Sequence, residues 1–122
     1  VVPKTIHAKM HNRLKRDLSK YSGIRFFMKA DRNLTVSFQL GDSEEDSLEE
    51  EIWYRNVSVG KDWKEVRIPF NTLSLHKRRA LKFGSNQILQ LQYIERMDWV
   101  VHEHVVPRGT VGTIWLDEVT FY

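Results

Sequence analysis

The sequence predicts an all-β fold, an antiparallel β-sandwich, on three observations. Apolar residues recur at every second position in several short segments, which is the period of strands with one buried face. β-Branched and aromatic residues are frequent in the same segments. No segment of about ten residues has the spacing of a strong amphipathic helix. We therefore expect roughly six or seven short strands in two packed sheets.

The first two strands are expected at residues 24–30 and 34–40. In both segments every second residue is apolar and the residues between them are mostly polar or basic. Only residues 31–33 separate the two segments. This short connection predicts that they pair as a hairpin.

Two more strands are expected at 53–59 and 63–70, with a turn at 60–62 that contains glycine and aspartate. Residues 71–87 are mixed in character and include a basic run. This stretch fits either a loop or a short helical turn.

The last two strands are expected at 93–106 and 113–122, on either side of the sequence Pro-Arg-Gly at 107–109. The chain contains no internal repeat and no low-complexity tract. A length of 122 residues suits one modest hydrophobic core. We therefore expect a single β-sandwich domain over residues 1–122.

An acidic segment lies between two of these strands, at 42–51. It begins with Gly-Asp-Ser at 41–43 and carries seven carboxylates. Such a composition predicts a solvated loop, and a cation site or a site for a basic partner is the alternative.

Composition excludes several classes of function. The absence of cysteine excludes a disulfide scaffold, a thiol nucleophile and a thiolate metal site. No apolar run reaches the roughly 18 residues of a membrane-spanning helix, so we expect no membrane insertion. The net charge is only +3, and the basic segment at 1–20 lacks the aromatic interleaving of a single-strand binder, so we expect no nucleic-acid partner.

The sequence also lacks the common catalytic motifs. It has no Gly-x-Ser-x-Gly elbow, no glycine-rich phosphate loop and no His-Glu-x-x-His pattern. The densest carboxylates fall in the predicted loop, where solvent would keep both members of any pair ionised. We expect no enzymatic activity.

Three phrases occur in an order that resembles a known family. They are Asp17–Phe26, Asp62–Phe70 and Gly112–Phe121. Over residues 14–122 they resemble jelly-roll domains of the galactose-binding-like superfamily. This group includes non-catalytic carbohydrate-binding modules of bacterial glycoside hydrolases, the β-glucan binders of family eleven among them, and the complex I intermediate-associated protein family.

The resemblance implies a jelly-roll sandwich and departs from the family at its start. Those domains usually begin with a further acidic and aromatic stretch before the equivalent of residues 5–10. We therefore expect a domain without the usual first strands, which would leave a sheet edge exposed. The resemblance to such carbohydrate-binding modules further implies a secreted, periplasmic or cell-surface protein.

A sandwich binds sugar through aromatic faces that stack on pyranose rings and through polar side chains that hydrogen-bond to hydroxyl groups. Tyr54 and Trp99 are the expected stacking residues. The side chains expected to bind hydroxyl groups are Arg25, Gln39, Arg67, His102 and His104. For Trp53, Trp63, Trp99 and Trp115, packing in the core is the alternative to stacking on a ligand.

Metal binding is a further expectation. His102 and His104 point the same way from one strand, but no third ligand lies nearby in the sequence, so we expect solvated or ligand-facing histidines, and a transition-metal site is the alternative. Asp117 is a lone carboxylate in an apolar closing strand. The resemblance implies a structural Ca²⁺ near the chain ends, for which Asp117 is the candidate ligand.

Together these features predict a non-catalytic module that binds a polysaccharide or oligosaccharide, of the β-glucan type, as an accessory part of a larger protein. The alternative is a structural or assembly domain that binds a protein partner or a second copy through a sheet edge or a charged face.

Overall fold

The computed structural model describes residues 12–43, 50–76, 88–101 and 111–122 of the chain. Within these ranges eight strands and two short 3₁₀-helices follow one another. In chain order they are β1 (Asn12–Arg16), β2 (Gly23–Ala30), β3 (Leu34–Ser43), β4 (Glu50–Val59), β5 (Lys64–Pro69), η1 (Phe70–Thr72), β6 (Ser74–Leu75), η2 (Leu91–Tyr93), β7 (Ile94–Val100) and β8 (Ile114–Phe121). No α-helix occurs among the described residues.

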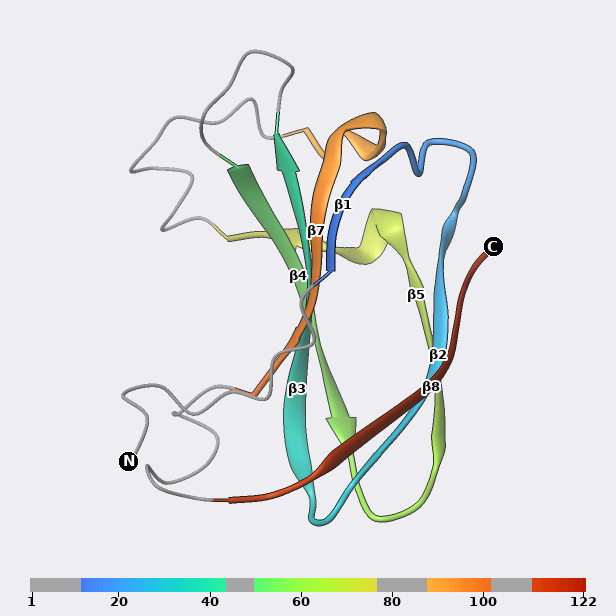
Figure 1. Ribbon diagram of the computed structural model, residues 1–122, viewed down its shortest axis with the longest axis vertical. Helices are drawn as coiled ribbons and strands as arrows, with labels where there is room; N and C mark the ends of the chain where they lie inside the picture. Colours follow the sequence, from blue (N-terminus) through green and yellow to red (C-terminus); the bar gives the residue numbers. More distant parts are fainter. Residues whose placement is uncertain (1–11, 44–49, 77–87, 102–110) are drawn as a thin grey trace.

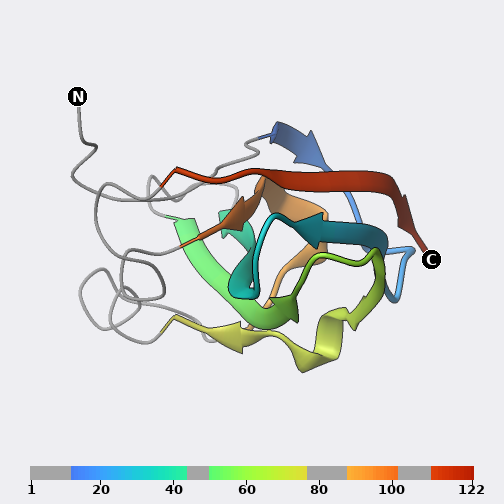
Figure 2. The same ribbon diagram turned by 90° about the horizontal axis from the view of Figure 1, so that it is seen from below.

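The strands form two antiparallel sheets that face each other (Figure 1). The larger sheet has the order β1-β7-β3-β4-β6. In the smaller sheet β8, β2 and β5 lie side by side in this order (Figure 2). This arrangement confirms the predicted all-β antiparallel sandwich.

The core fills the space between the sheets, and the period-two pattern explains which side chains enter it. On β2, Ile24, Phe26 and Met28 are fully buried, whereas the residues between them are only partly buried. Phe38 on β3 and Trp99 on β7 face them from the larger sheet. The rings of Phe26 and Trp99 meet edge to face with centroids 5.5 Å apart, and Phe38 lies 5.4 Å from Trp99.

The predicted hairpin of 24–30 with 34–40 is wrong. Both strands exist, but β2 belongs to the smaller sheet and β3 to the larger one. The connection at 31–33 therefore passes from one sheet to the other. Hydrogen bonds tie it to neighbouring turns, because the Ala30 N–H donates to the Gly60 carbonyl at 2.7 Å and the Asp31 N–H to the Thr113 carbonyl at 3.0 Å. These bonds replace the turn hydrogen bond of a hairpin.

The other predicted segments agree with the structure to different degrees. Strands β4, β5 and β8 lie where 53–59, 63–70 and 113–122 were expected. The mixed stretch contains η1 and β6, and its residues 77–87 lie outside the described residues. Strand β7 occupies the first part of 93–106, and residues 102–106 are outside the described residues.

The acidic segment is not a loop at its two ends. Asp42 pairs with Glu51 and Ser43 with Glu50 in the β3–β4 ladder. Asp42 is buried at 1% exposure, and its Oδ2 accepts a hydrogen bond of 2.7 Å from the Gln90 N–H. A carboxylate with such partners can extend a strand into buried surroundings. Residues 44–49 lie outside the described residues.

The smaller sheet has β5 and β8 as its outer strands among the described residues. Among the strands that the structure describes, β8 pairs only with β2, and most of its residues are exposed. Strand β8 is therefore a sheet edge in the described part of the chain, and the expected lack of the usual first strands stays a prediction. No described helix is both long and apolar enough to cross a membrane.

Candidate functional site

A row of polar side chains crosses the outer face of the larger sheet. In the strand register Gln39 lies directly opposite Tyr54 on one side and opposite Asp98 on the other, and Tyr54 lies opposite Ser74. Because directly opposed residues of an antiparallel pair point to the same face, these four side chains share the face turned away from the core. We call this set, Asp98, Gln39, Tyr54 and Ser74, the polar row.

An ion pair, a hydrogen bond and a ring contact hold three members of the polar row, Asp98, Gln39 and Tyr54. The Arg96 guanidinium forms an ion pair with Asp98, with an Nε to Oδ2 distance of 3.2 Å. Gln39 Nε2 donates to Ser37 Oγ at 3.2 Å. The ring of Tyr54 meets the His76 ring edge to face with centroids 6.1 Å apart. These contacts hold the side chains in place before any ligand arrives.

The polar row contains one buried residue, Asp98, and three residues that are more accessible to solvent. Asp98 is only 1% exposed, whereas Gln39 and Tyr54 are half-buried and Ser74 is exposed. The three inter-strand spacings that it crosses correspond to about 14 Å. An aromatic ring beside amide, hydroxyl and charged groups over this length can stack on one ring of a ligand and hydrogen-bond to others.

Two of the predicted hydroxyl-binding residues lie on the opposite side of the molecule. Arg25 and Arg67 pair directly across β2 and β5, on the outer face of the smaller sheet. Both donate to Glu65 Oε1, at 3.0 Å and 2.7 Å. The expectation that they share a site with Tyr54 is wrong, because the sandwich lies between the two faces (Figure 1).

The expectation that Trp99 stacks on a ligand is also wrong. It is 4% exposed and packs against Phe26 and Phe38 in the core, so its ring offers no face to a ligand. Trp53 packs against the same core. Trp63 and Trp115 are instead exposed, at 48% and 41%, on the smaller sheet's side of the molecule.

The predicted metal ligands give no centre in the described part of the chain. Asp117 is exposed, and its Oδ1 accepts a hydrogen bond of 2.8 Å from the Glu118 N–H. Glu118 has a φ of 50°, so this bond stabilises an irregular point of β8. Among the described residues no three His, Asp or Glu side chains are grouped for a metal. His102 and His104 lie outside the described residues, and calcium at Asp117 stays a prediction.

Sequence reasoning missed Asp98, Arg96 and Ser74 as members or partners of the row. Arg96 and Asp98 alternate with the buried Met97 and Trp99, so their parity was visible in the sequence. Their position opposite Gln39 depends on the pairing of β3 with β7, which joins segments far apart in the chain. Alternation within one segment does not carry that information.

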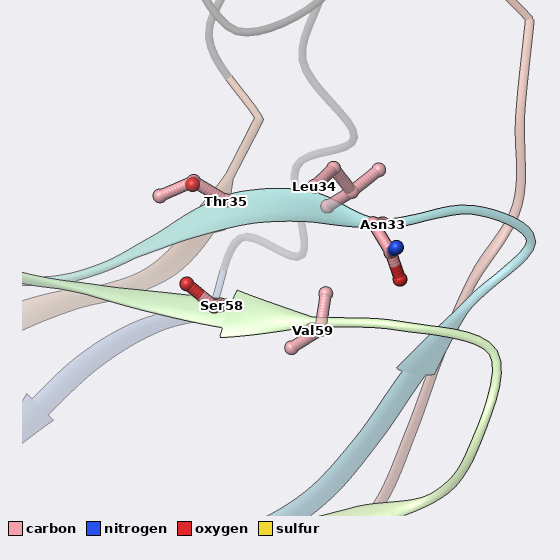
Figure 3. A pocket seen from close by; sticks show the side chains of 5 residues that line it. All are labelled: Asn33, Leu34, Thr35, Ser58 and Val59. Carbon is pink, nitrogen blue, oxygen red and sulfur yellow. The ribbon is translucent and has the colours of Figure 1, made fainter.

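A shallow open hollow lies at one end of β3 and β4. Figure 3 shows side chains from both strands around it, and its lining residues are Asn33, Leu34, Thr35, Ser58 and Val59. None of them is charged or aromatic. The hollow therefore lacks the stacking ring that the polar row has.

Two solved structures resemble this fold closely. One is the family 11 carbohydrate-binding module from Clostridium thermocellum in complex with a β-1,3-1,4-mixed-linked tetrasaccharide, with a TM-score of 0.75 and 17% sequence identity. The other is the family 11 carbohydrate-binding module of the cellulosomal cellulase Lic26A-Cel5E of Clostridium thermocellum, with a TM-score of 0.75 and 18% identity. The matches cover 94% of this chain and 67% and 66% of the other two.

At this level of identity the likeness concerns the fold. The chain spans about two thirds of the length of each family 11 module. No family model and no curated protein matches the sequence. The resemblance to the complex I intermediate-associated family stays a prediction. The chain thus has the jelly-roll sandwich fold of family 11 carbohydrate-binding modules.

Proposed function

We propose that this protein is a non-catalytic carbohydrate-binding module that holds a β-glucan-type chain on the outer face of its larger sheet. The polar row carries this proposal, because it places an accessible tyrosine ring beside fixed hydrogen-bonding groups. The fold likeness to modules of family 11 supports it, and one of those modules was solved with a mixed-linked tetrasaccharide.

In the proposed complex Tyr54 stacks on the apolar face of one pyranose ring. The Gln39 amide, which both donates and accepts, binds hydroxyl groups of the adjacent ring. Arg96 provides a charged donor at one end of the row, and the buried Asp98 carboxylate holds it in place through their ion pair. The row crosses the strands, so the sugar chain lies roughly perpendicular to them.

The polar row is suited to binding and not to glycoside hydrolysis. Hydrolysis requires two carboxyl groups flanking the scissile bond, with separated pKa values. Within the row Asp98 is the single carboxyl, and it is buried and paired with Arg96. We therefore propose an accessory domain without catalysis. The cellulosomal enzyme that carries one of the similar modules supports an extracellular or cell-surface location.

The test is retention in native gels that contain soluble mixed-linkage β-glucan. Tyr54→Ala removes the stacking ring and should reduce affinity about tenfold, a loss that corresponds to about 1.4 kcal/mol. Tyr54→Phe keeps the ring and should retain most of the affinity. Arg67→Ala, on the opposite face, is the matched control and should bind like the parent protein. Equal retention of parent and Tyr54→Ala would contradict the proposal.

A second candidate is the binding of a protein strand at the edge of β8. Val119 in this strand and Tyr122 just after it are 37% and 40% exposed, and within the described residues β8 pairs on one side only. Pairing of β8 with its own copy about the strand centre would oppose Asp117 and Glu118, which is unfavourable. If light scattering shows a stable complex between two copies, the contact between them is therefore not this pairing of β8 with itself.

A further inference from the structure

The outer face of the smaller sheet carries an aromatic and cationic surface that the proposed function does not use. Lys29 lies directly opposite Trp115 in the register of β2 and β8. On its other side Trp63 immediately precedes β5, which pairs with β2. The Lys29 Nζ lies 5.0 Å from the centroid of each indole ring. We call these three residues the tryptophan–lysine face.

Both indole rings of this face remain accessible. Trp63 is 48% exposed and Trp115 is 41% exposed, whereas the Trp99 ring is 4% exposed. Because Lys29 Nζ contacts both rings, their centroids are at most twice 5.0 Å apart. Two exposed aromatic rings at such a separation, with a cation between them, are not required by the core and favour a ligand.

The charge of this face is positive. In the described part of the chain no carboxylate forms an ion pair with Lys29, whose ammonium group lies over the two indole rings. On the same outer face Arg25 and Arg67 share the Glu65 carboxylate. Asp117 lies on this face as well, directly opposite Phe27, so three cationic side chains stand against two carboxylates. The face therefore presents apolar rings together with an excess of positive charge.

We infer that the tryptophan–lysine face binds an acidic polysaccharide that contains uronate residues. In such a polymer the carboxylate is attached to the pyranose ring itself. An anionic group can then reach Lys29 while neighbouring rings stack on Trp63 and Trp115. This inference does not depend on the proposed function, because it concerns the opposite face of the sandwich.

Two other anionic polymers fit this arrangement less well. An acidic peptide provides carboxylates but no regular series of flat apolar rings. In a single-stranded nucleic acid the phosphates lie across the sugar from the stacked bases, whereas Lys29 is placed between the two stacking rings. These polymers serve as the alternatives in the test.

The experiment measures retention of the full chain in native gels that contain polygalacturonate, at low and at moderate salt. The parent protein should be retarded, and added salt should weaken the retardation. Lys29→Gln and Trp115→Ala should each lose tenfold or more in apparent affinity. Lys29→Arg keeps the charge and should retain binding. Tyr54→Ala is the control from the other face and should bind polygalacturonate like the parent.

Several outcomes would overturn the inference. One is the absence of retardation by polygalacturonate and alginate at low salt, and another is parental binding by both Lys29→Gln and Trp115→Ala. Equal or stronger retention by poly-glutamate would assign the face to acidic polypeptides, and stronger retention by oligo-thymidylate would assign it to nucleic acid. Circular dichroism melting checks the fold of each variant, and the Lys29→Gln and Lys29→Arg pair decides the matter if Trp115→Ala is unstable. If Tyr54→Ala loses the binding of mixed-linkage glucan but still binds polygalacturonate, the two ligands use different faces, as this inference requires.

Discussion

At the residue scale, Glu65 shows how a shared ion pair sets a pKa. The side-chain hydrogen bond from Arg67 lowers the pKa of Glu65 below its usual 4.5, and the bond from Arg25 adds to the effect. A carboxyl whose folded pKa is lowered stabilises the fold above its unfolded pKa, and this stabilisation is lost as the pH falls through the folded pKa. The relevant window therefore lies below pH 4.5.

We predict that Arg67→Gln raises the pKa of Glu65 toward 4.5, because it removes the largest cause of the shift. An NMR titration of the side-chain carboxyl measures this pKa. Lys64→Gln is the matched control, since the Lys64 ammonium donates to the Ser58 carbonyl and not to Glu65. A pKa that is the same in both variants would show that the Arg67 hydrogen bond is absent in solution.

The four tryptophans show what residue type alone predicts. For each of them the sequence allows core packing or ligand stacking. The structure buries Trp99, packs the partly buried Trp53 against the core and exposes Trp63 and Trp115. All four lie in alternating segments, so the residue type does not separate them. Burial depends on which neighbouring strand covers the ring, and that is a property of the assembled sheets.

We predict very different costs of removing a buried and an exposed tryptophan. Trp99→Ala should destabilise the protein by about 3–5 kcal/mol, because it empties the contact with Phe26 and Phe38. Trp63→Ala should cost less than about 1 kcal/mol, because half of that side chain is already in solvent. Urea denaturation measures both values. Similar midpoints for the two variants would place Trp99 outside the core.

At the element scale, the alternating pattern predicts strands better than it predicts their partners. The pattern located β2 and β3 to within a few residues because burial on one face requires period two. It did not show that β2 pairs with β5 and β8. A connection as short as 31–33 fits a hairpin and also fits a crossing between sheets. Long-range hydrogen bonds, such as that from the Asp31 N–H to the Thr113 carbonyl, decide between the hairpin and the crossing.

The start of β2 gives a prediction about backbone contact between strands. A Cβ added at Gly23 would lie 2.6 Å from the Ile68 carbonyl oxygen, which belongs to the β5 backbone. We expect Gly23→Ala to destabilise the protein by about 1–3 kcal/mol, because β2 and β5 must separate locally. Gly60→Ala is the control and should cost less, since its new Cβ meets the movable Asn33 side chain. Thermal melting that ranks the two variants in the opposite order would contradict this.

At the scale of the whole molecule, a sandwich has two outer faces, and sequence parity does not distinguish them. Arg25, Gln39 and Arg67 alternate with buried residues, and Tyr54 follows the partly buried Trp53, so the sequence predicts one common site. The topology separates them into Gln39 and Tyr54 on the larger sheet and the two arginines on the smaller sheet. The candidate site was therefore half predictable, because the outward direction follows from the pattern and the choice of face follows from strand order.

This separation leads to a prediction about the molecule as a whole. The core of the sandwich lies between the polar row and the tryptophan–lysine face, so ligands on the two faces do not touch (Figure 1). Two sites without shared contacts and without a change of fold have a coupling free energy near zero. We therefore expect the Kd for a polygalacturonate oligosaccharide to be the same with and without saturating mixed-linkage glucan tetrasaccharide. Isothermal titration measures both values. Lys29→Gln should weaken only the binding of polygalacturonate, and Tyr54→Ala should weaken only the binding of the glucan. Competition between the two ligands would mean that both use one face.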